Sequence, residues 1–180
     1  MNNVNSSPPA SWKPWFQTHG SRLLLFARQQ TRTSEDAEDV LQEAMLRLWK
    51  SGMIDKTEDG SDEPCLAGAF TQIRRAAIDQ ARKNIRRANR ESRAMELDGT
   101  SDVVWFKDTM EQDERSQQIE QAIQTLPDYY KEVIILKIWG ELTFEQIADT
   151  LDIPMNTAAS RYRYALEKLR RTLTPAKLAA

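Results

Sequence analysis

Residues 140–164 read GELTFEQIADTLDIPMNTAASRYRY, and this segment carries the clearest fold information in the chain. Four apolar side chains recur there at positions i, i+3, i+4 and i+7, namely Phe144, Ile147, Ala148 and Leu151. That spacing places them on one face of an α-helix, because about 3.6 residues make one helical turn. The segment therefore begins with a short amphipathic helix.

Both ends of this helix can be placed. Thr143 and Gln146 have the spacing of a capping box, which starts the helix directly after Thr143. Pro154 disfavours a helical conformation in the residue before it and so ends the helix. A second helix is expected to begin near Asn156 or Thr157 and to run past residue 171. A short helix, a tight turn and a second helix predict a helix-turn-helix.

The second helix has an inner and an outer side. At about 100° per residue, the inner side carries Ala158, Tyr162, Ala165 and Leu169. The opposite side carries Asn156, Ser160, Arg163, Tyr164 and Arg171, with Thr157 and Arg161 flanking them. Hydrogen-bonding and guanidinium groups thus gather near the helix N-terminus, where a recognition helix reads the major groove. The alternative is a solvated polar face on an ordinary helical hairpin.

Working outward, the whole chain is predicted to be all-α, with two small helical domains joined by a linker. The C-terminal domain is expected to be a helix-turn-helix (winged-helix-like) domain. The expected parts are a disordered tail over 1–11, an N-terminal helical domain over 12–94, a linker over 95–114 and the C-terminal domain over 115–174. Helices are expected over 12–30, from Thr33 or Ser34 to Lys50, and over 66–93. The acidic segment 52–64 is expected to be a loop, and Val104–Phe106 is an apolar island in the linker.

Composition excludes several classes of protein. One cysteine, Cys65, is too few for an internal disulfide or a multi-cysteine metal site. The polar start, residues 1–10, shows no signal peptide, and no run of about 18 apolar residues suggests a membrane span. We therefore expect a cytoplasmic protein with no cofactor. A net charge of −2 in 180 residues gives no general affinity for nucleic acid, so any such affinity must be local.

The third expected helix is strongly basic. Between residues 74 and 93, eight arginines and lysines face only two acids, Asp79 and Glu91. Such a density of positive charge favours binding to the phosphate backbone of a nucleic acid, because binding releases counterions. The alternatives are a solvated basic face and a helix lying on anionic lipid. The lipid alternative is weak, because no large apolar face accompanies the charges.

The second expected helix has a complete inner stripe and an unusual outer face. Its inner residues are Ala37, Val40, Leu41, Ala44 and Leu48, and its outer residues are Asp39, Gln42, Glu43, Leu46 and Trp49. Apolar and aromatic side chains bordered by charges are typical of a partner surface. Packing of Trp49 on the first helix is the alternative.

Catalysis finds little support in the sequence. His19 is the only histidine, and no phosphate-cradling loop or nucleophile elbow is present. We expect no catalytic residue and no metal site.

Taken together, these segments resemble the extracytoplasmic-function group of the sigma-70 family. The run Asp36–Glu43 (DAEDVLQE) with Leu46 and Trp49 is similar to the family's polymerase-clamp helix. Ile78–Asp79 and Arg82 with the basic run resemble its helix for the minus-ten promoter element. The third match, to the domain for the minus-thirty-five element, is made by Leu126–Pro127, Val133, Leu136, Leu142–Thr143, Ile147–Ala148, Thr157, Ser160 and Arg161.

The resemblance implies a non-enzymatic factor that binds core RNA polymerase and directs it to promoter DNA. It implies a polymerase-binding set of Asp36, Asp39, Gln42, Glu43, Leu46 and Trp49. It implies a DNA-binding set of Arg74, Arg75, Asp79, Arg82, Lys83, Arg86, Arg87, Thr143, Asn156, Thr157, Ser160, Arg161, Arg163 and Tyr164. Many members are held inactive by an anti-sigma factor, which is therefore a further expected partner.

The chain departs from the family pattern at two places. The family's recognition helix commonly starts Gly–Thr–Val–Lys–Ser–Arg, whereas this one reads Asn–Thr–Ala–Ala–Ser–Arg from Asn156. Asn156 can cap the helix or adopt a positive φ, but Ala159 lacks the basic group. The residues before Asp79 read Arg–Arg–Ala–Ala, where the family often has Asn. The missing basic group at Ala159 implies a weaker phosphate contact or a different base preference at the recognition helix, and the Arg–Arg–Ala–Ala run leaves base choice in the minus-ten element open.

Two other functions remain compatible with parts of the sequence. A stand-alone DNA-binding regulator would use the helix-turn-helix without the Leu46–Trp49 face and would usually bind a palindrome as a dimer. A nucleic-acid-processing enzyme would use the basic helix for affinity alone. Association with core polymerase separates the first of these from a sigma factor.

Overall fold

The structure is a computed structural model and describes residues 11–56, 62–91, 119 and 121–173. These residues are mainly helical and belong to two compact units that divide between Val103 and Val104. The all-α fold class is therefore confirmed. The expected tail up to residue 10 and the expected linker with Val104–Phe106 lie outside the described residues.

The first unit is built from three helices, each of which packs on the other two. They are α1 (Trp12–Gln30), α2 (Ser34–Ser51) and α3 (Leu66–Glu91), close to the predicted bounds. The continuation of α3 to Arg93 lies outside the described residues. Phe26 of α1 and Phe70 of α3 meet edge to face, with ring centroids 5.4 Å apart. This geometry suits the quadrupoles of two aromatic rings and centres the core.

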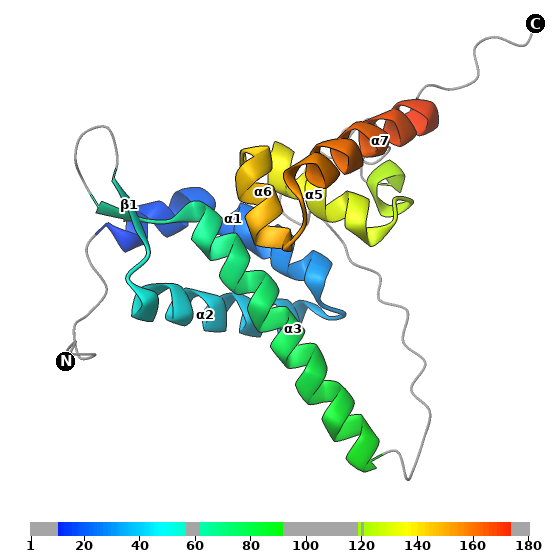
Figure 1. Cartoon of the computed structure of the whole chain (residues 1–180). Helices are drawn as coiled ribbons and strands as arrows, with labels where there is room; N and C mark the ends of the chain where they lie inside the picture. The colour runs from blue at the N-terminus through cyan, green and yellow to red at the C-terminus, as the bar shows by residue number, and fades with distance from the viewer. Residues whose placement is uncertain (1–10, 57–61, 92–118, 120, 174–180) are drawn as a thin grey trace, which may run out of the picture. The chain divides into compact units, whose positions relative to one another are not determined.

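Only the N-terminal half of α3 belongs to that core. Ala69, Phe70, Ile73, Ala76 and Ala77 are buried, whereas every side chain from 81 to 87 is exposed. Figure 1 shows α3 running on beyond α1 and α2. The described basic side chains of residues 82–87 therefore lie on a helix that projects from its own unit.

The two ends of α2 are closed by local interactions. The Thr33 hydroxyl accepts a hydrogen bond from the Asp36 N–H at 3.0 Å, which satisfies one of the free donors at the helix start. At the other end, Gly52 adopts a φ of +62° and donates to the Trp49 carbonyl at 3.1 Å. Glycine has no Cβ to oppose this left-handed conformation.

The segment between α2 and α3 is not entirely a loop, and that part of the prediction was wrong. Strands β1 (Ile54–Lys56) and β2 (Asp62–Pro64) pair in antiparallel register, with Ile54 opposite Pro64 and Lys56 opposite Asp62. The Cys65 N–H also donates to the Met53 carbonyl at 3.1 Å. The two strands are held by backbone pairing. The acidic sequence lacks the alternation of apolar and polar residues that marks a half-buried strand, so the pattern did not predict them.

The second unit contains α5 (Asp128–Ile138), α6 (Phe144–Leu151) and α7 (Met155–Leu173), preceded by helical residues at 119 and 121–124. The α5 residues Val133–Leu136 are buried together with Ile147, Ala158 and Ala165. α6, a three-residue turn and α7 form the predicted helix-turn-helix. α7 begins at Met155, slightly before the expected start, and the Pro154 carbonyl accepts from the Thr157 and Ala158 N–H groups.

Candidate polymerase-binding and DNA-binding faces

The inner and outer faces of α2 are as the periodicity predicts. Its inner stripe, Ala37, Val40, Leu41, Ala44 and Leu48, is buried. On the outer face Asp39, Gln42 and Glu43 are exposed, and the Leu46 side chain is 47% exposed. Trp49 is half-buried, so only part of it is accessible on this face. We call Asp39, Gln42, Glu43, Leu46 and Trp49 the α2 outer face.

Asp36 differs from the other predicted polymerase-binding residues. It is half-buried, and one of its carboxylate oxygens accepts a hydrogen bond from the Gln80 amide of α3. This contact occupies part of the carboxylate's hydrogen-bonding capacity within the chain. Asp36 therefore helps to hold α2 against α3.

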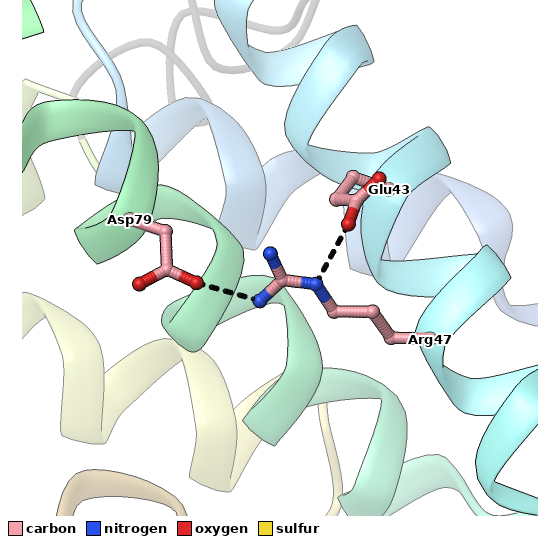
Figure 2. A network of polar contacts seen from close by, with 3 residues as sticks. All are labelled: Glu43, Arg47 and Asp79. Carbon is pink, nitrogen blue, oxygen red and sulfur yellow. Dashed lines mark hydrogen bonds and ion pairs between the residues drawn. The ribbon is translucent and has the colours of Figure 1, made fainter. Parts of the chain in front are cut away.

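Arg47 was not among the predicted site residues, but it contacts two of them. Its Nε lies 2.8 Å from Glu43 Oε1, and its Nη1 lies 2.8 Å from Asp79 Oδ2 (Figure 2). Glu43 was predicted to bind polymerase and Asp79 to bind DNA, so one guanidinium joins two predicted sites. The hydrogen bonds that Arg47 donates to Glu43 and, to a lesser extent, to Asp79 raise the pKa of Arg47, and desolvation lowers it by less.

The sequence held a partial signal for this contact. Glu43 precedes Arg47 by four residues, which is the favourable order for a helical ion pair. The bond to Asp79 could not be foreseen, because it spans 32 residues and depends on how α2 and α3 cross. We call Glu43, Arg47 and Asp79 the α2–α3 clasp.

The basic residues of α3 do not all lie in the same environment. Arg75, Arg82, Lys83, Arg86 and Arg87 are exposed, whereas Arg74 is half-buried and its Nε is screened from solvent. The side chains of Arg90 and Arg93 lie outside the described residues. The exposed group is thus concentrated on the projecting part of the helix.

The helix-turn-helix has the predicted start. Thr143 and Gln146 make both bonds of the capping box, at 3.1 Å and 2.9 Å. The helix ends at Leu151 and is followed by Asp152, which takes a left-handed conformation with φ of 55°. Aspartate tolerates this conformation better than most residues, and it lets the chain turn sharply into α7.

Asn156 does not play either backbone role that the sequence suggested. It lies exposed in the first turn of α7, and the positive-φ residues other than glycine in the described chain are Glu141 and Asp152. Pro154 precedes the helix and supplies the carbonyl of its first turn, so no Asn cap is needed there. The Asn156 side chain is instead presented at the helix N-terminus.

The two sides of α7 are largely as predicted. Ala158, Ala165 and Leu169 are buried, and Tyr162 is half-buried with its ring edge-on to Phe144 at 5.7 Å. Asn156, Arg163, Tyr164 and Arg171 are exposed, and Thr157, Ser160 and Arg161 are half-buried. The polar groups expected to read DNA therefore gather on one side of α7.

Tyrosine rings accompany two of the arginines on α7. The Arg161 Cζ lies 5.4 Å from the centroid of the Tyr129 ring on α5, and the Arg163 Cζ lies 4.9 Å from that of Tyr164. Arg163 also donates to the Tyr164 hydroxyl at 3.3 Å. Tyr129 was not among the predicted site residues, because nothing in its local sequence indicates contact with Arg161 on a later helix.

Neither a metal site nor a membrane span is found in the described residues. No three of their His, Cys, Asp and Glu side chains are grouped so that they could hold a metal ion. Within the same ranges, each helix is too short or too polar to cross a lipid bilayer.

Each of the two units matches the model of a known protein family. Residues 15–87 match the model described as Sigma-70 region 2, and residues 116–169 match that described as Sigma-70, region 4. Region 2 thus contains α1, α2 and most of α3, and region 4 contains the helix-turn-helix. These matches define a sigma-70 type of transcription initiation factor.

Relatives narrow the class further. An ECF RNA polymerase sigma factor SigK of Mycobacterium ulcerans is 32% identical over 139 residues, which is 76% of this chain and 72% of the relative. SigK of Mycobacterium bovis is 26% identical over 175 residues, or 96% of this chain and 91% of the relative. The chain belongs to the extracytoplasmic-function (ECF) group of RNA polymerase sigma factors. It is therefore a non-enzymatic factor for promoter-specific initiation.

A solved structure shares the fold. The sigma factor RpoE of Bartonella quintana, in complex with the anti-sigma factor NepR, matches with a TM-score of 0.66 at 22% identity. The match covers 92% of this chain and 98% of the other.

Proposed function

We propose that three helical faces divide the work of promoter-specific initiation. The α2 outer face docks on core RNA polymerase, the projecting part of α3 engages the minus-ten element, and the polar side of α7 reads the minus-thirty-five element. The chain acts in the cytoplasm, where polymerase and chromosomal DNA meet. Membership of the ECF group supports this division, and the exposure of each face supports the residues assigned to it.

The observation that carries the polymerase assignment is the exposed Leu46 side chain. It is 47% exposed although α2 already buries a complete inner stripe. Exposed Asp39, Gln42 and Glu43 surround it with polar and acidic groups. An apolar anchor within a charged rim is the usual anatomy of a binding surface, and a stand-alone DNA-binding regulator has no use for it.

The first prediction tests this face with Leu46→Ser. We expect the variant to bind purified core polymerase at least tenfold more weakly, because a central anchor typically contributes about 2 kcal/mol. Its melting temperature should stay close to that of the unmodified chain, since the side chain is not part of the core. Affinity is measured by fluorescence titration of the labelled full chain with core enzyme.

Phe16→Ser is the matched control, because Phe16 is an apolar residue of α1 with a similar exposure of 41%. It should leave polymerase affinity unchanged. Equal weakening by both variants, or none by Leu46→Ser, would remove Leu46 from the docking face.

The α3 assignment rests on charge and exposure. Arg82, Lys83, Arg86 and Arg87 are exposed on a helix that projects from its unit (Figure 1). Neutralising phosphates with such side chains releases counterions and contributes affinity without sequence information. We propose that this part of α3 holds the separated strands at the minus-ten element, while half-buried Arg74 and clasped Asp79 help to position the helix.

The α7 assignment rests on the side-chain types presented together. Asn156, Thr157, Ser160, Arg161, Arg163 and Tyr164 offer amide, hydroxyl and guanidinium groups to base edges and phosphates. Thr143 stands exposed at the N-terminus of α6, where it can face the backbone of the same duplex. The minus-thirty-five element is therefore read by one helix and approached by the start of another.

Two modest DNA contacts become strong when they are joined. Covalent linkage makes the second contact intramolecular and gives it a high effective concentration. The proposed domains, 12–94 and 115–174 with a linker over 95–114, supply such a connection. Binding of both domains to polymerase further restricts their positions relative to the DNA.

An anti-sigma factor is the other proposed partner. The RpoE of Bartonella quintana was solved with one. For this chain we expect such a factor to cover the α2 outer face, because that is the direct way to compete with polymerase. Competition between the captured factor and core enzyme for the labelled chain would test this expectation.

A further inference from the structure

Tyr129 holds a position that its burial does not explain. It lies in the first turn of α5 and is 46% exposed, so it contributes little to the core of its unit. Its ring nevertheless lies beneath the Arg161 guanidinium, with 5.4 Å between Cζ and the ring centroid. This distance falls within the about 6 Å over which a cation is attracted to an aromatic face.

The contact joins two helices. Tyr129 belongs to α5 and Arg161 to α7, and these helices pack against each other. The Arg163–Tyr164 pair is different, because both residues lie on α7 and both are exposed. Tyr129 can therefore fix the direction of Arg161 relative to the whole unit, which Tyr164 cannot do for Arg163.

The ring of Tyr129 is itself supported. The Tyr130 ring meets it edge to face, with centroids 4.4 Å apart. Desolvation, followed by the neighbouring Tyr129 phenol, raises the pKa of Tyr130 above its ordinary value. The adjacent Asp128 carboxylate lies 3.4 Å from Lys131 Nζ, which offsets the repulsion it would exert on a phosphate.

A guanidinium held by one face keeps its N–H groups free at its edge. Arginine stacks on aromatic rings and still donates hydrogen bonds in its own plane. Immobilising the side chain before binding also removes part of the entropy cost of ordering it at an interface. The arrangement therefore prepares Arg161 to donate to an acceptor on DNA.

We propose that Tyr129 is a positioning residue for recognition of the minus-thirty-five element, acting by holding Arg161. This inference rests on the proposed function of α7. Tyr129 itself need not touch DNA. What matters is the aromatic ring and not the hydroxyl group.

The test uses holoenzyme assembled from core polymerase and the full chain. The probe is a library of promoter fragments whose upstream element is randomised, and bound fragments are sequenced to give the preference at each base. Arg161→Ala should lower the preference at particular positions. Tyr129→Leu should lower it at the same positions by about two- to fivefold, which corresponds to about 0.4–1 kcal/mol.

Three further variants identify the cause. Tyr129→Phe keeps the ring and should retain the preference of the unmodified chain. Tyr129→Leu combined with Arg161→Ala should be no worse than Arg161→Ala alone, since both changes remove one interaction. Ile138→Ala, at an α5 residue with the same 46% exposure, is the matched control and should have no effect.

Several results would overturn the inference. Additive losses in the double variant would show that Tyr129 acts independently of Arg161. A loss in Tyr129→Phe equal to that in Tyr129→Leu would assign a direct role to the hydroxyl. An unchanged profile for Tyr129→Leu would remove the residue from recognition, while a profile lost at all positions together with a lowered melting temperature would make its role structural. If the unmodified holoenzyme selects no sequence at all, the proposed function of α7 fails instead.

Discussion

Arg47 joins carboxylates from two helices, and its replacement tests the α2–α3 clasp. Arg47→Ala should lower the free energy of unfolding by about 1 kcal/mol or less, because all three side chains are partly exposed. Arg47→Lys should recover only part of the loss, since an ammonium group lacks the planar fork that reaches both partners. Urea unfolding of each variant measures the difference.

The stability that the clasp contributes depends on pH through the pKa of Arg47. Hydrogen bonds in the folded state raise the pKa of Arg47, so its contribution is complete below the unfolded pKa and is lost only in strongly alkaline solution. The difference between Arg47→Ala and the unmodified chain should therefore be constant from about pH 7 to pH 9. A difference that disappears within this range, or one that is just as large when Asp79→Asn is already present, would argue against the clasp, because only the Glu43 contact should then remain.

Helical periodicity alone predicted most of the residues of α2 and α7 that face outward, although Trp49 and Ser160 are half-buried. Leu46, Arg163 and Tyr164 are exposed where their spacing places them, because these helices are long and regular enough for a 3.6-residue repeat to hold. Arg47 with Asp79, and Tyr129 with Arg161, were not predictable in this way. Each pair depends on the crossing of two helices, which no local pattern encodes.

At the scale of an element, α6 depends on its capping box. Thr143→Ala removes the oxygen that accepts from the Gln146 N–H and should cost about 1 kcal/mol. Thr143→Ser keeps an acceptor and should cost much less. Thermal unfolding of the full chain provides the measurement.

Thr172→Ala is the control for this change. Its exposed hydroxyl bonds the Lys168 carbonyl within α7 and caps no helix start. It should shift stability by less than about 0.5 kcal/mol. If Thr143→Ala is as mild as the control, the capping box is not what fixes α6.

The projecting part of α3 makes a prediction about salt. Replacing Arg86 and Arg87 together with Ala should keep the helix, since Ala has the highest helix propensity. If both side chains contact phosphates, the slope of log affinity against log salt should fall by about 1.4 on single-stranded DNA. The measurement is holoenzyme binding to a promoter fragment with an unpaired minus-ten segment.

Lys13→Ala removes an exposed basic side chain from α1 instead, and as the control it should leave this slope unchanged. An unaltered slope for the Arg86 and Arg87 variant would show that the projecting helix does not follow the phosphate backbone.

The hairpin before α3 is an element that the sequence did not predict. Its strands pair through backbone groups that composition does not report.

For the whole molecule, the order of faces along the chain distinguishes a sigma factor from a regulator. The helix-turn-helix alone is compatible with either, and the α2 outer face and basic α3 precede it in the order of region 2 and region 4. The departures at Asn156 and Ala159 leave α7 helical, and we propose that they change which groups the helix offers to bases. Promoter choice is therefore the property in which this chain should differ from its relatives.

Transcription in vitro tests the central claim most directly. Purified core polymerase and the full chain are incubated with fragments that cover the source genome, and the 5′ ends of the transcripts are mapped. We predict discrete start sites that share two upstream elements at constant spacing, together with their loss for Leu46→Ser. Absence of chain-dependent initiation at every site, with the chain failing to associate with core enzyme, would contradict the account.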